Sequence, residues 1–329
     1  ERTNHTMSTA GANLNQTTPS IWMLLAIAQS LCWLFGLPHI CRMYWDSLFG
    51  SLSIEQASVR LVWCTNLGII IGYNLLMLPI YYSQHPFFEQ FNIQKDRPWP
   101  WLDTRETVRC DFWALTTRSF KLTAFNIFVV VPILILAKVY FLDPILLACH
   151  IISLNPSIFL TDDESWPTLY ENVRDILGMV MIHELGFYAT HRASHEYPWL
   201  YRFHKVHHEY KVNTTLAAQY NHPVDYIGSI LLPFLMAVVC FHSSHSISVF
   251  QFEIWTLVAN MDDHVGYSFP WSPVRWIPYL CASTDEHEFH HSKNLGCFGS
   301  KIRVWNYLFG GYECYNKRST ENDVSHKRK

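Results

Sequence analysis

The chain has 329 residues, enough for one large domain or two ordinary ones, and only 16% of them are charged, against roughly 25% in typical soluble domains. Half of the residues are hydrophobic and many stand in long apolar runs, so the composition favours a membrane protein over a soluble domain. The formal net charge of -3 argues against nucleic acid as a partner, and nine cysteines without CxxC spacing argue against a disulfide framework.

The N-terminal part of the chain divides into a polar and an apolar segment. Residues 1–20 are polar, predict disorder and contain the sequons Asn4-His5-Thr6 and Asn15-Gln16-Thr17, which can be glycosylated only in the lumen. Residues 21–60 begin with an apolar stretch near the length that spans a bilayer, without a basic flank or a cleavage site. They predict an uncleaved anchor or a buried helix, followed by a linker.

The next apolar runs predict a first pair of membrane spans. Residues 61–82 form a good span, and residues 122–142 form a second one. Six Lys and Arg residues at positions 95–121 predict a cytosolic loop between them, because basic residues collect on the cytosolic side. Residues 144–160 are apolar but interrupted by Asn155-Pro156, which predicts a partial or re-entrant segment.

Residues 173–190 predict the segment that returns to the cytosol. They are apolar overall, although Asp175, His183 and Glu184 make them a poor lipid-facing helix. The acidic stretch Asp162-Asp163-Glu164 that precedes them suits a lumenal loop.

A second hairpin is expected at residues 224–241 and 246–260, entering the membrane and returning. The mixed composition after residue 261 predicts a cytosolic part that ends in a basic tail, residues 313–329. The sequence therefore predicts an all-α protein: an integral membrane helical bundle with a cytosolic histidine-rich helical cap. Residues 61–312 would form its membrane-embedded catalytic domain.

The 18 histidines of the chain are concentrated in three boxes, "HRASH", "HKVHH" and "HEFHH". On a helix, spacings of three and four residues place the imidazoles of each box on one face. The predicted spans bring all three boxes to the same side of the membrane. The boxes contribute His191 and His195, then His204, His207 and His208, then His287, His290 and His291, and a single His264 follows the second hairpin.

So many convergent imidazoles indicate a metal centre. They would repel one another if protonated and would bury unsatisfied nitrogens if neutral, whereas a metal ion removes both problems. Eight or nine ligands exceed what one ion takes, so two metals with four or five nitrogens each fit the number. Imidazole suits iron, copper or zinc. Four nearby carboxylates are candidates to accept hydrogen bonds from the outer ring nitrogens: Asp262, Asp263, Asp285 and Glu209.

A competing hypothesis comes from the third box alone. His287-Glu288-x-x-His291 matches the HExxH pattern of zinc peptidases, in which the Glu acts as general base. That chemistry would leave the first two boxes without a role, so the metal-oxygenase hypothesis is favoured. A non-enzymatic metal-binding membrane protein is a third possibility, and the completeness of the boxes argues against it.

At these boxes the chain resembles the fatty acid hydroxylase superfamily of membrane oxygenases, over roughly residues 60–312. Within it, "IQKDRP", "LYRFHKVHHEY", "YNHPVDY" and "VWNYLFGG" are similar to C-4 methylsterol oxidases. "HEYPWLYRFHKVHH" and "DDHVGYSFPWSP" are equally similar to cholesterol 25-hydroxylases. The sequence departs from this pattern at Phe187, where methylsterol oxidases tend to have a histidine, and at Glu288, where relatives often have Asp.

The resemblance implies hydroxylation of an unactivated C–H bond of a sterol or related lipid. It implies a di-iron centre, O2 as co-substrate, and electrons from NAD(P)H through cytochrome b5 or a b5 reductase-type donor. It also implies a multi-pass protein of the endoplasmic reticulum membrane with its histidine boxes facing the cytosol. An acyl-chain hydroxylase acting on a fatty acid or ceramide is the alternative within the superfamily, and a membrane zinc metallopeptidase is the alternative from another class.

By the same resemblance, the eight box histidines are expected to bind iron and His264 to be a ninth ligand. His222, Asp263 and Glu288 are expected either to bind metal or to hold the ligands in place, and His183 is expected chiefly to be a core histidine. No GxGxxG nucleotide-binding pattern occurs, so electrons would come from a separate donor. Four basic residues could dock that donor or contact lipid headgroups: Arg192, Arg202, Lys205 and Lys211.

Overall fold

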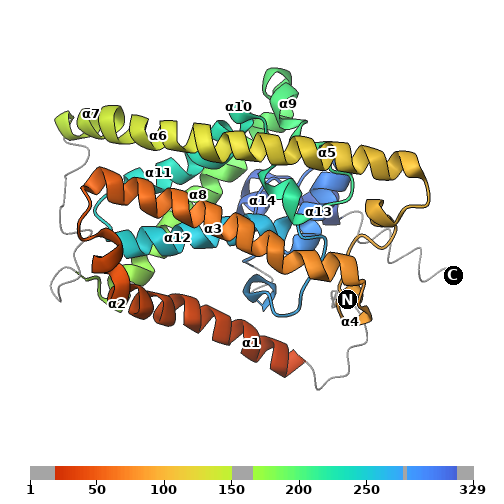
Figure 1. The fold of residues 1–329 in the computed structure, drawn as a ribbon, viewed down its shortest axis with the longest axis horizontal. Helices are drawn as coiled ribbons and strands as arrows, with labels where there is room; N and C mark the ends of the chain where they lie inside the picture. Colours follow the sequence, from red (N-terminus) through yellow and green to blue (C-terminus); the bar gives the residue numbers. More distant parts are fainter. Residues whose placement is uncertain (1–18, 150–165, 277–279, 317–329) are drawn as a thin grey trace, which may run out of the picture.

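A computed structural model of the chain describes residues 19–149, 166–276 and 280–316, and every regular element in these ranges is a helix (Figure 1). The all-α prediction is confirmed. Both sequons, the acidic stretch before residue 165 and most of the basic tail lie outside the described residues. Helix α1 begins at Pro19, within the segment expected to be disordered.

The N-terminal apolar segment forms a long helix at the side of the bundle. α1 (Pro19–Leu31) continues through a π-helical turn, η1 (Cys32–Gly36), into α2 (Leu37–Phe49). The stretch Ile21–Phe49 is long and apolar enough to cross a membrane, and only 6% of it is buried. Such exposure of apolar side chains suits an anchor in lipid and argues against the buried-helix alternative.

Two further long helices lie side by side across the front of the molecule in Figure 1. α3 (Ile54–Ser83) starts at a capping box, in which Ser53 and Gln56 satisfy each other's backbone N–H groups. It contains the span expected at residues 61–82 and is followed by the short α4 (Pro86–Glu89).

The second of these helices is an unbroken succession of α and π turns. It runs through α5 (Glu106–Phe125), η3 (Asn126–Val130), α6 (Val131–Ala137), η4 (Lys138–Leu142) and α7 (Asp143–Ala148).

The prediction of a loop at residues 95–121 is wrong for the second half of this range. After a short 3-10 turn, η2 (Pro100–Leu102), the helix α5 begins at Glu106. The continuous helix has 43 residues, about 64 Å at 1.5 Å per residue, against a hydrocarbon core of about 30 Å. Its basic N-terminal turns can therefore stand outside the bilayer while remaining helical. Only the first part of the expected 144–160 segment is described, and it is the helix α7.

α8 (Leu169–Glu196) crosses the centre of the bundle and packs on α11 and α12. It begins at a capping box formed by Thr168 and Glu171. The polar residues that made this segment a poor lipid-facing helix, Asp175, His183 and Glu184, are all buried within the protein. Packing against protein rather than lipid explains the composition of this helix.

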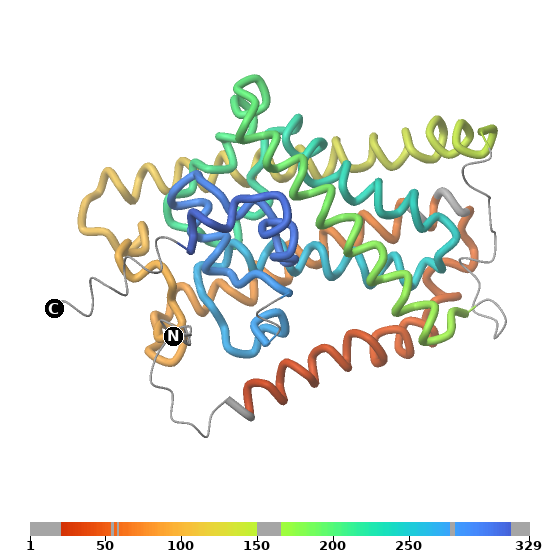
Figure 2. Tube along the Cα trace, turned by 180° about the vertical axis from the view of Figure 1, so that it is seen from behind, coloured from red at the N-terminus to blue at the C-terminus, as the bar shows by residue number. Residues whose placement is uncertain are grey.

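The second hairpin is present as α10 (Pro223–Asp225), η8 (Tyr226–Leu231) and α11 (Leu232–Cys240), followed by the returning α12 (Ser246–Asp263). Figure 2 shows α11 beside α8 from behind. Four helices in the described chain are long and apolar enough to cross a membrane: Ile21–Phe49, Val59–Ser83, Glu106–Ala148 and Pro223–Cys240. These helices indicate a multi-pass membrane protein.

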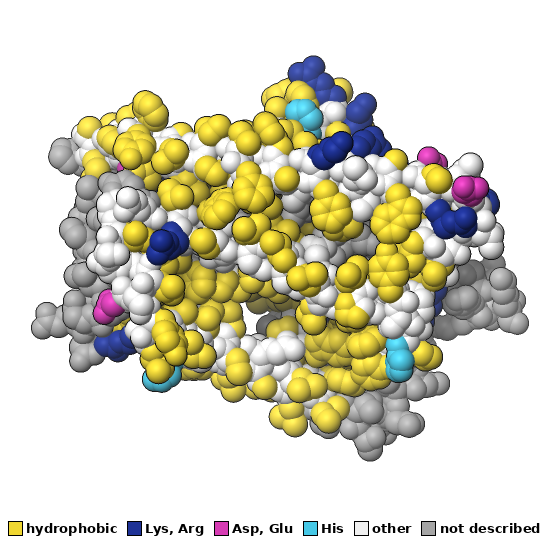
Figure 3. Space-filling model, viewed as in Figure 1, with side chains coloured by type: hydrophobic (Ala, Val, Ile, Leu, Met, Phe, Trp, Pro, Cys, Tyr) yellow, Lys and Arg dark blue, Asp and Glu magenta, His cyan; other side chains and the backbone are white. Residues whose placement is uncertain are grey.

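Short helices form the cap at one end of the bundle (Figures 1 and 2). They are α9 (Pro198–His204), η6 (His207–Glu209), η7 (Thr215–Gln219), η9 (Pro273–Trp276), α13 (Thr284–Lys293) and α14 (Val304–Phe309). Figure 3 shows apolar side chains over the long helices and a group of Lys and Arg side chains around α9. This division matches a lipid-facing bundle with a basic aqueous end.

Candidate metal centre

The helices deliver the histidine boxes to one place in the cap. The last two turns of α8 carry His191 and His195, and the last residue of α9 is His204. His264 follows α12 as its C-terminal cap, and α13 carries the third box. The second box does not lie on one helix as expected, because α9 ends at His204 and the other two histidines stand in the 3-10 turn η6.

Nine imidazoles form two groups, in each of which the potential ligand nitrogens lie within 4.8 Å of one another. All nine are the histidines expected from the sequence, and eight are buried while His195 is half-buried. The five-histidine cluster consists of His191, His195, His204, His208 and His290, and the four-histidine cluster consists of His207, His264, His287 and His291.

The boxes do not each present one face, contrary to the expectation from helical spacing. The first and last histidines of a box share a cluster, whereas the i+3 histidines, His207 and His290, lie in the opposite one. At about 100° per residue, i+4 deviates from i by about 40° and i+3 by about 60° in the other direction. In the third box, which lies entirely on α13, the adjacent His290 and His291 therefore diverge by about 100°, which distributes them between two neighbouring sites.

The four-histidine cluster has the spacing that a metal ion imposes. Its Nε2 atoms converge, with His264 Nε2 lying 3.1 Å from His207 Nε2, 3.0 Å from His291 Nε2 and 3.1 Å from His287 Nε2. An ion bound at about 2.0–2.1 Å from each nitrogen would place neighbouring nitrogens about 3 Å apart. A neutral ring has one N–H, so these nitrogens cannot all pair with one another without an ion. The residues fit a metal.

In the five-histidine cluster two rings are anchored through Nδ1 to backbone carbonyls, and the Nε2 atoms of three rings have no hydrogen-bond partner in the described structure. His191 Nδ1 donates to the Phe298 carbonyl at 2.7 Å and His290 Nδ1 to the Gly296 carbonyl at 2.7 Å. A carbonyl only accepts, so Nδ1 carries the proton and Nε2 keeps its lone pair. The Nε2 atoms of these two rings and of His195 are buried without a hydrogen-bond partner among the described residues. Such orphaned nitrogens are what a metal ion would use.

One carboxylate orients a cluster ring, and it is not among those expected. Asp225 lies with both carboxylate oxygens 3.0 Å from His204 Nδ1. His264 Nδ1 donates instead to the Asn260 carbonyl at 2.8 Å. None of the four carboxylates proposed from the sequence accepts from a cluster histidine in the described structure. No local spacing links Asp225 to His204, and only the fold brings them together.

The protonation state also fits metal binding. Burial lowers the pKa of His191 to about 3, with a further lowering from His204. Burial likewise lowers the pKa of His195 to about 2 and that of His264 to about 4. These rings are therefore neutral at pH 7, which is the form of imidazole that binds metals.

Two ion-pair networks include the sequence neighbours of cluster histidines, Glu288 beside His287 and Asp263 beside His264, and the sequence did not indicate their cationic members. Glu288 pairs with Arg97 and accepts from Asn213 Nδ2 at 2.5 Å. Lys301 is 1% exposed, and its Nζ lies 3.0 Å from Asp262 and 2.5 Å from Asp263. The residues that pair with Glu288 and Asp263 come from distant segments, so no local sequence pattern predicts these pairs.

The remaining candidates lie outside both clusters. Asp263 and Glu288 belong to the networks just described. His222 caps α10 by accepting from the Val224 backbone N–H at 3.2 Å, and its ring packs on Phe203 with centroids 4.7 Å apart. His183 lies two turns before His191, with Phe187 between them, and its Nδ1 is 3.8 Å from Glu184 Oε1.

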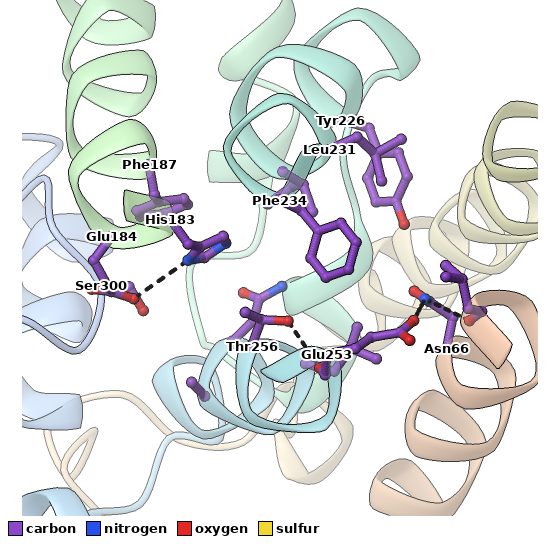
Figure 4. A pocket seen from close by; sticks show the side chains of 15 residues that line it. Asn66, His183, Glu184, Phe187, Tyr226, Leu231, Phe234, Glu253, Thr256 and Ser300 are labelled. Atoms are coloured by element: carbon purple, nitrogen blue, oxygen red, sulfur yellow. Dashed lines mark hydrogen bonds and ion pairs between the residues drawn. The ribbon is translucent and has the colours of Figure 1, made fainter. Parts of the chain in front are cut away.

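A largely apolar cavity of about 60 Å³ lies next to the metal centre (Figure 4). α8 contributes His183 and Phe187, α12 contributes Glu253 and Asn260, and further lining residues come from α3, η8 and α11. The centroid of the Phe187 ring lies 5.1 Å from that of the His191 ring, and the Asn260 carbonyl accepts from His264, so lining residues of the cavity contact both clusters.

Comparison with known proteins agrees with the family resemblance seen at the histidine boxes. Residues 176–311 match the fatty acid hydroxylase family model. Methylsterol monooxygenase 1 of Danio rerio is 27% identical over 259 residues, which cover 77% of this chain and 78% of that protein. C-4 methylsterol oxidase of Schizosaccharomyces pombe is 30% identical over 175 residues, which cover 52% of this chain and 54% of that protein.

Cholesterol 25-hydroxylase of Mus musculus is 30% identical over 146 residues, which cover 44% of this chain and 48% of that protein. No solved structure gives a significant match. The family match contains all nine cluster histidines and lies within the region, 61–312, that the sequence indicated. The chain is thus an oxidoreductase that is similar to the fatty acid hydroxylase family over residues 176–311, and its curated relatives belong to the sterol-modifying branch.

Proposed function

We propose that this protein is a di-iron oxygenase that hydroxylates an unactivated C–H bond of a sterol or a related membrane lipid. The observation that carries the proposal is the pair of buried imidazole clusters beside an apolar cavity. An all-nitrogen ligand set suits iron, copper or zinc, and the family match favours iron. The relatives' names, methylsterol monooxygenase and cholesterol 25-hydroxylase, favour a sterol.

In this proposal the five-histidine cluster holds one iron and the four-histidine cluster the other. The bound irons would supply the redox chemistry that reduces O2. The overall reaction balances as R–H + O2 + 2 electrons + 2 protons giving R–OH + H2O. The Phe298 and Gly296 carbonyls and Asp225 fix ring orientations, and burial keeps the imidazoles neutral. The apolar cavity excludes water and presents the hydrocarbon to the clusters.

Electrons would come from NAD(P)H through a separate cytochrome b5-type donor on the cytosolic face of the endoplasmic reticulum. A cleft of about 770 Å³ lies on the outer side of the cap and has His208 of the five-histidine cluster in its wall. Its charged lining is mainly basic, with Asp103, Asp111 and Glu209 as the acidic members. The basic members, which suit an acidic donor, are Arg97, Arg105, Arg118, Lys205 and Lys211.

The peptidase alternative is disfavoured by where the third box points. A catalytic zinc needs an open position and a general base beside it. Here His287 and His291 share a cluster with two further histidines, which would complete four ligands. Glu288, the required base, pairs with Arg97 and Asn213 instead. No observation favours an acyl chain over a sterol as substrate, so the acyl-chain hydroxylase stays an alternative for the experiment.

The test is oxygenation in proteoliposomes containing the full chain, cytochrome b5, its reductase and NADH under 18O2. Cholesterol, a 4-methylsterol, a ceramide and a free fatty acid would be offered separately. Incorporation of one 18O atom into a sterol supports the proposal. The His204→Ala variant should abolish the product, whereas His39→Ala, in the exposed part of α2, should retain it. Oxidation of only the acyl lipids would establish the alternative, and no oxygenated lipid at all would contradict the proposal.

A further inference from the structure

Two carboxyl groups line the cavity, those of Glu184 and Glu253, and the proposed chemistry uses neither. Glu184 Oε1 faces His183 Nδ1 at 3.8 Å, whereas Glu253 has no imidazole beside it among the described residues. Glu253 lies in the middle of α12, is 1% exposed and lines the cavity in Figure 4. Its Oε1 accepts a hydrogen bond from Asn66 Nδ2 of α3. Its Oε2 is buried without a hydrogen-bond partner in the described structure. A buried, unpartnered carboxyl oxygen is costly, and its persistence in a cavity wall points to a ligand with a polar group.

The carboxyl group lies on the face of α12 that leads to the metal centre. Steps of four, three and four residues along α12 lead from Glu253 through Leu257 and Asn260 to His264, and such steps stay on one helix face. The first three of these residues line the cavity, and the fourth belongs to the four-histidine cluster. The eleven intervening steps correspond to about 16 Å along the helix axis. Glu253 thus lies about three helical turns away from the cluster histidine His264, on the same face of α12.

We propose that Glu253, held by Asn66, binds a hydroxyl group of the lipid substrate and so places the oxidised carbon at the opposite end of the molecule. This inference rests on the proposed function and specifies its substrate and orientation. A hydroxyl both donates and accepts, so it complements the carboxyl group in either protonation state. The cavity lining includes the apolar side chains Ile230, Leu231 and Phe234, which suit the hydrocarbon body of such a lipid.

A sterol has this distribution of groups. Its hydroxyl stands on the first ring, and its branched apolar tail extends from the last. With the hydroxyl at Glu253, the tail faces the metal centre, and a ring carbon next to the hydroxyl-bearing carbon does not reach it. About 60 Å³ is room for a few water molecules and not for a sterol, so binding widens the cavity by displacing wall side chains.

The first experiment measures binding, independently of turnover. Purified full-length protein in phosphatidylcholine nanodiscs would be titrated with cholesterol and with cholest-5-ene, which lacks the hydroxyl. We expect the preference for cholesterol to fall at least about tenfold in Glu253→Leu, because a hydrogen bond to a carboxyl group is lost. Glu253→Gln should keep part of the preference, since the amide can still pair with Asn66 and with a hydroxyl.

Thr256→Val is the matched cavity-wall control. The Thr256 hydroxyl already donates to the Glu253 carbonyl at 2.8 Å, so its removal should leave the preference within about twofold of wild type. An unchanged preference in Glu253→Leu would overturn the inference. If that variant does not fold, the titrations of the wild-type protein still test the inference. Equal affinity of the wild-type protein for the two sterols would overturn it as well.

The second experiment locates the oxidised carbon in the product of the wild-type enzyme by tandem mass spectrometry. Oxygen in the sterol tail supports the orientation, and oxygen on the ring carbon adjacent to the hydroxyl-bearing carbon overturns it. The proposed function and the proposed hydroxyl-binding role of Glu253 can be contradicted separately. Hydroxyl-dependent sterol binding without oxidation would contradict only the proposed function. Sterol oxidation with a preference that does not depend on Glu253 would contradict only this subsite.

Discussion

His207 and His290 each point into the cluster to which the other histidines of their own box do not belong. His207 joins His287 and His291 in the four-histidine cluster, and His290 joins His204 and His208 in the five-histidine cluster. The second and third boxes thus exchange their i+3 members. Because of this exchange, neither site can be completed by a single segment, and metal binding is coupled to the packing of α13 against the turn that carries the second box.

The exchange predicts that single substitutions empty specific sites. His207→Ala should reduce occupancy of the four-histidine cluster and His290→Ala that of the five-histidine cluster, each giving about one metal per chain instead of two. Elemental analysis of the purified variants would measure this. His222→Ala is the control, since His222 caps α10 outside both clusters and its loss should leave two metals. Loss of both metals in His222→Ala would contradict the assignment.

Asp225 is predicted to act through His204. Asp225→Asn leaves the amide within reach of Nδ1 but removes the charge that orients the ring in its metal-binding form. Outer partners of this kind typically change metal affinity about 10–100-fold. Chelator competition should show that the five-histidine cluster loses its metal first. Equal retention of both metals by the variant and the wild type would show that Asp225 has no such effect.

Lys301 is predicted to be a stability residue. Its ammonium group is buried between Asp262 and Asp263, and Lys301→Met would leave both carboxylates without their cation. Breaking a buried ion pair in this way costs about 3–5 kcal/mol. The free energy of unfolding in detergent should fall by that order, whereas Lys121→Met, at an exposed position of α5, should change it by less than about 0.5 kcal/mol. Similar stability of the two variants would refute this role.

Glu288 separates the oxygenase from the peptidase. Glu288→Gln keeps an oxygen that can accept from Arg97 or Asn213, so the fold and part of the oxygenation should survive. In a peptidase the same change removes the general base and abolishes activity. Lipid oxygenation by the variant would be measured beside hydrolysis of a peptide library. Complete loss of oxygenation with intact metal content would mean that Glu288 takes part in the reaction directly.

Much of this protein could be predicted from its sequence because its strongest signals are local. Apolar runs of bilayer length predicted the long helices, the histidine spacings indicated eight of the nine cluster members, and the family resemblance indicated the ninth, His264. Helical spacing did not predict how the histidines are shared, since the second box leaves helix α9 after His204 and adjacent histidines diverge around the axis. The division into two clusters depends on how four segments pack together.

Long-range partners were the part that sequence could not supply. Arg97 and Glu288 are 191 positions apart, and Lys301 lies 39 positions from Asp262. Such pairs are set by tertiary structure, and no spacing rule covers them. A loop was expected at residues 95–121 because the basic residues there indicated a cytosolic segment outside the membrane. A helix longer than the bilayer accommodates the same charges beyond the membrane.

The most direct test of the central claim is the metal content of the wild-type chain, purified in detergent from iron-supplemented, zinc-limited medium. Zinc binds nitrogen sites more tightly than ferrous iron, so the growth conditions decide which metal is found. The account predicts about two iron ions per chain, held at two separate histidine clusters. A single zinc ion per chain, unchanged by His204→Ala, would contradict it.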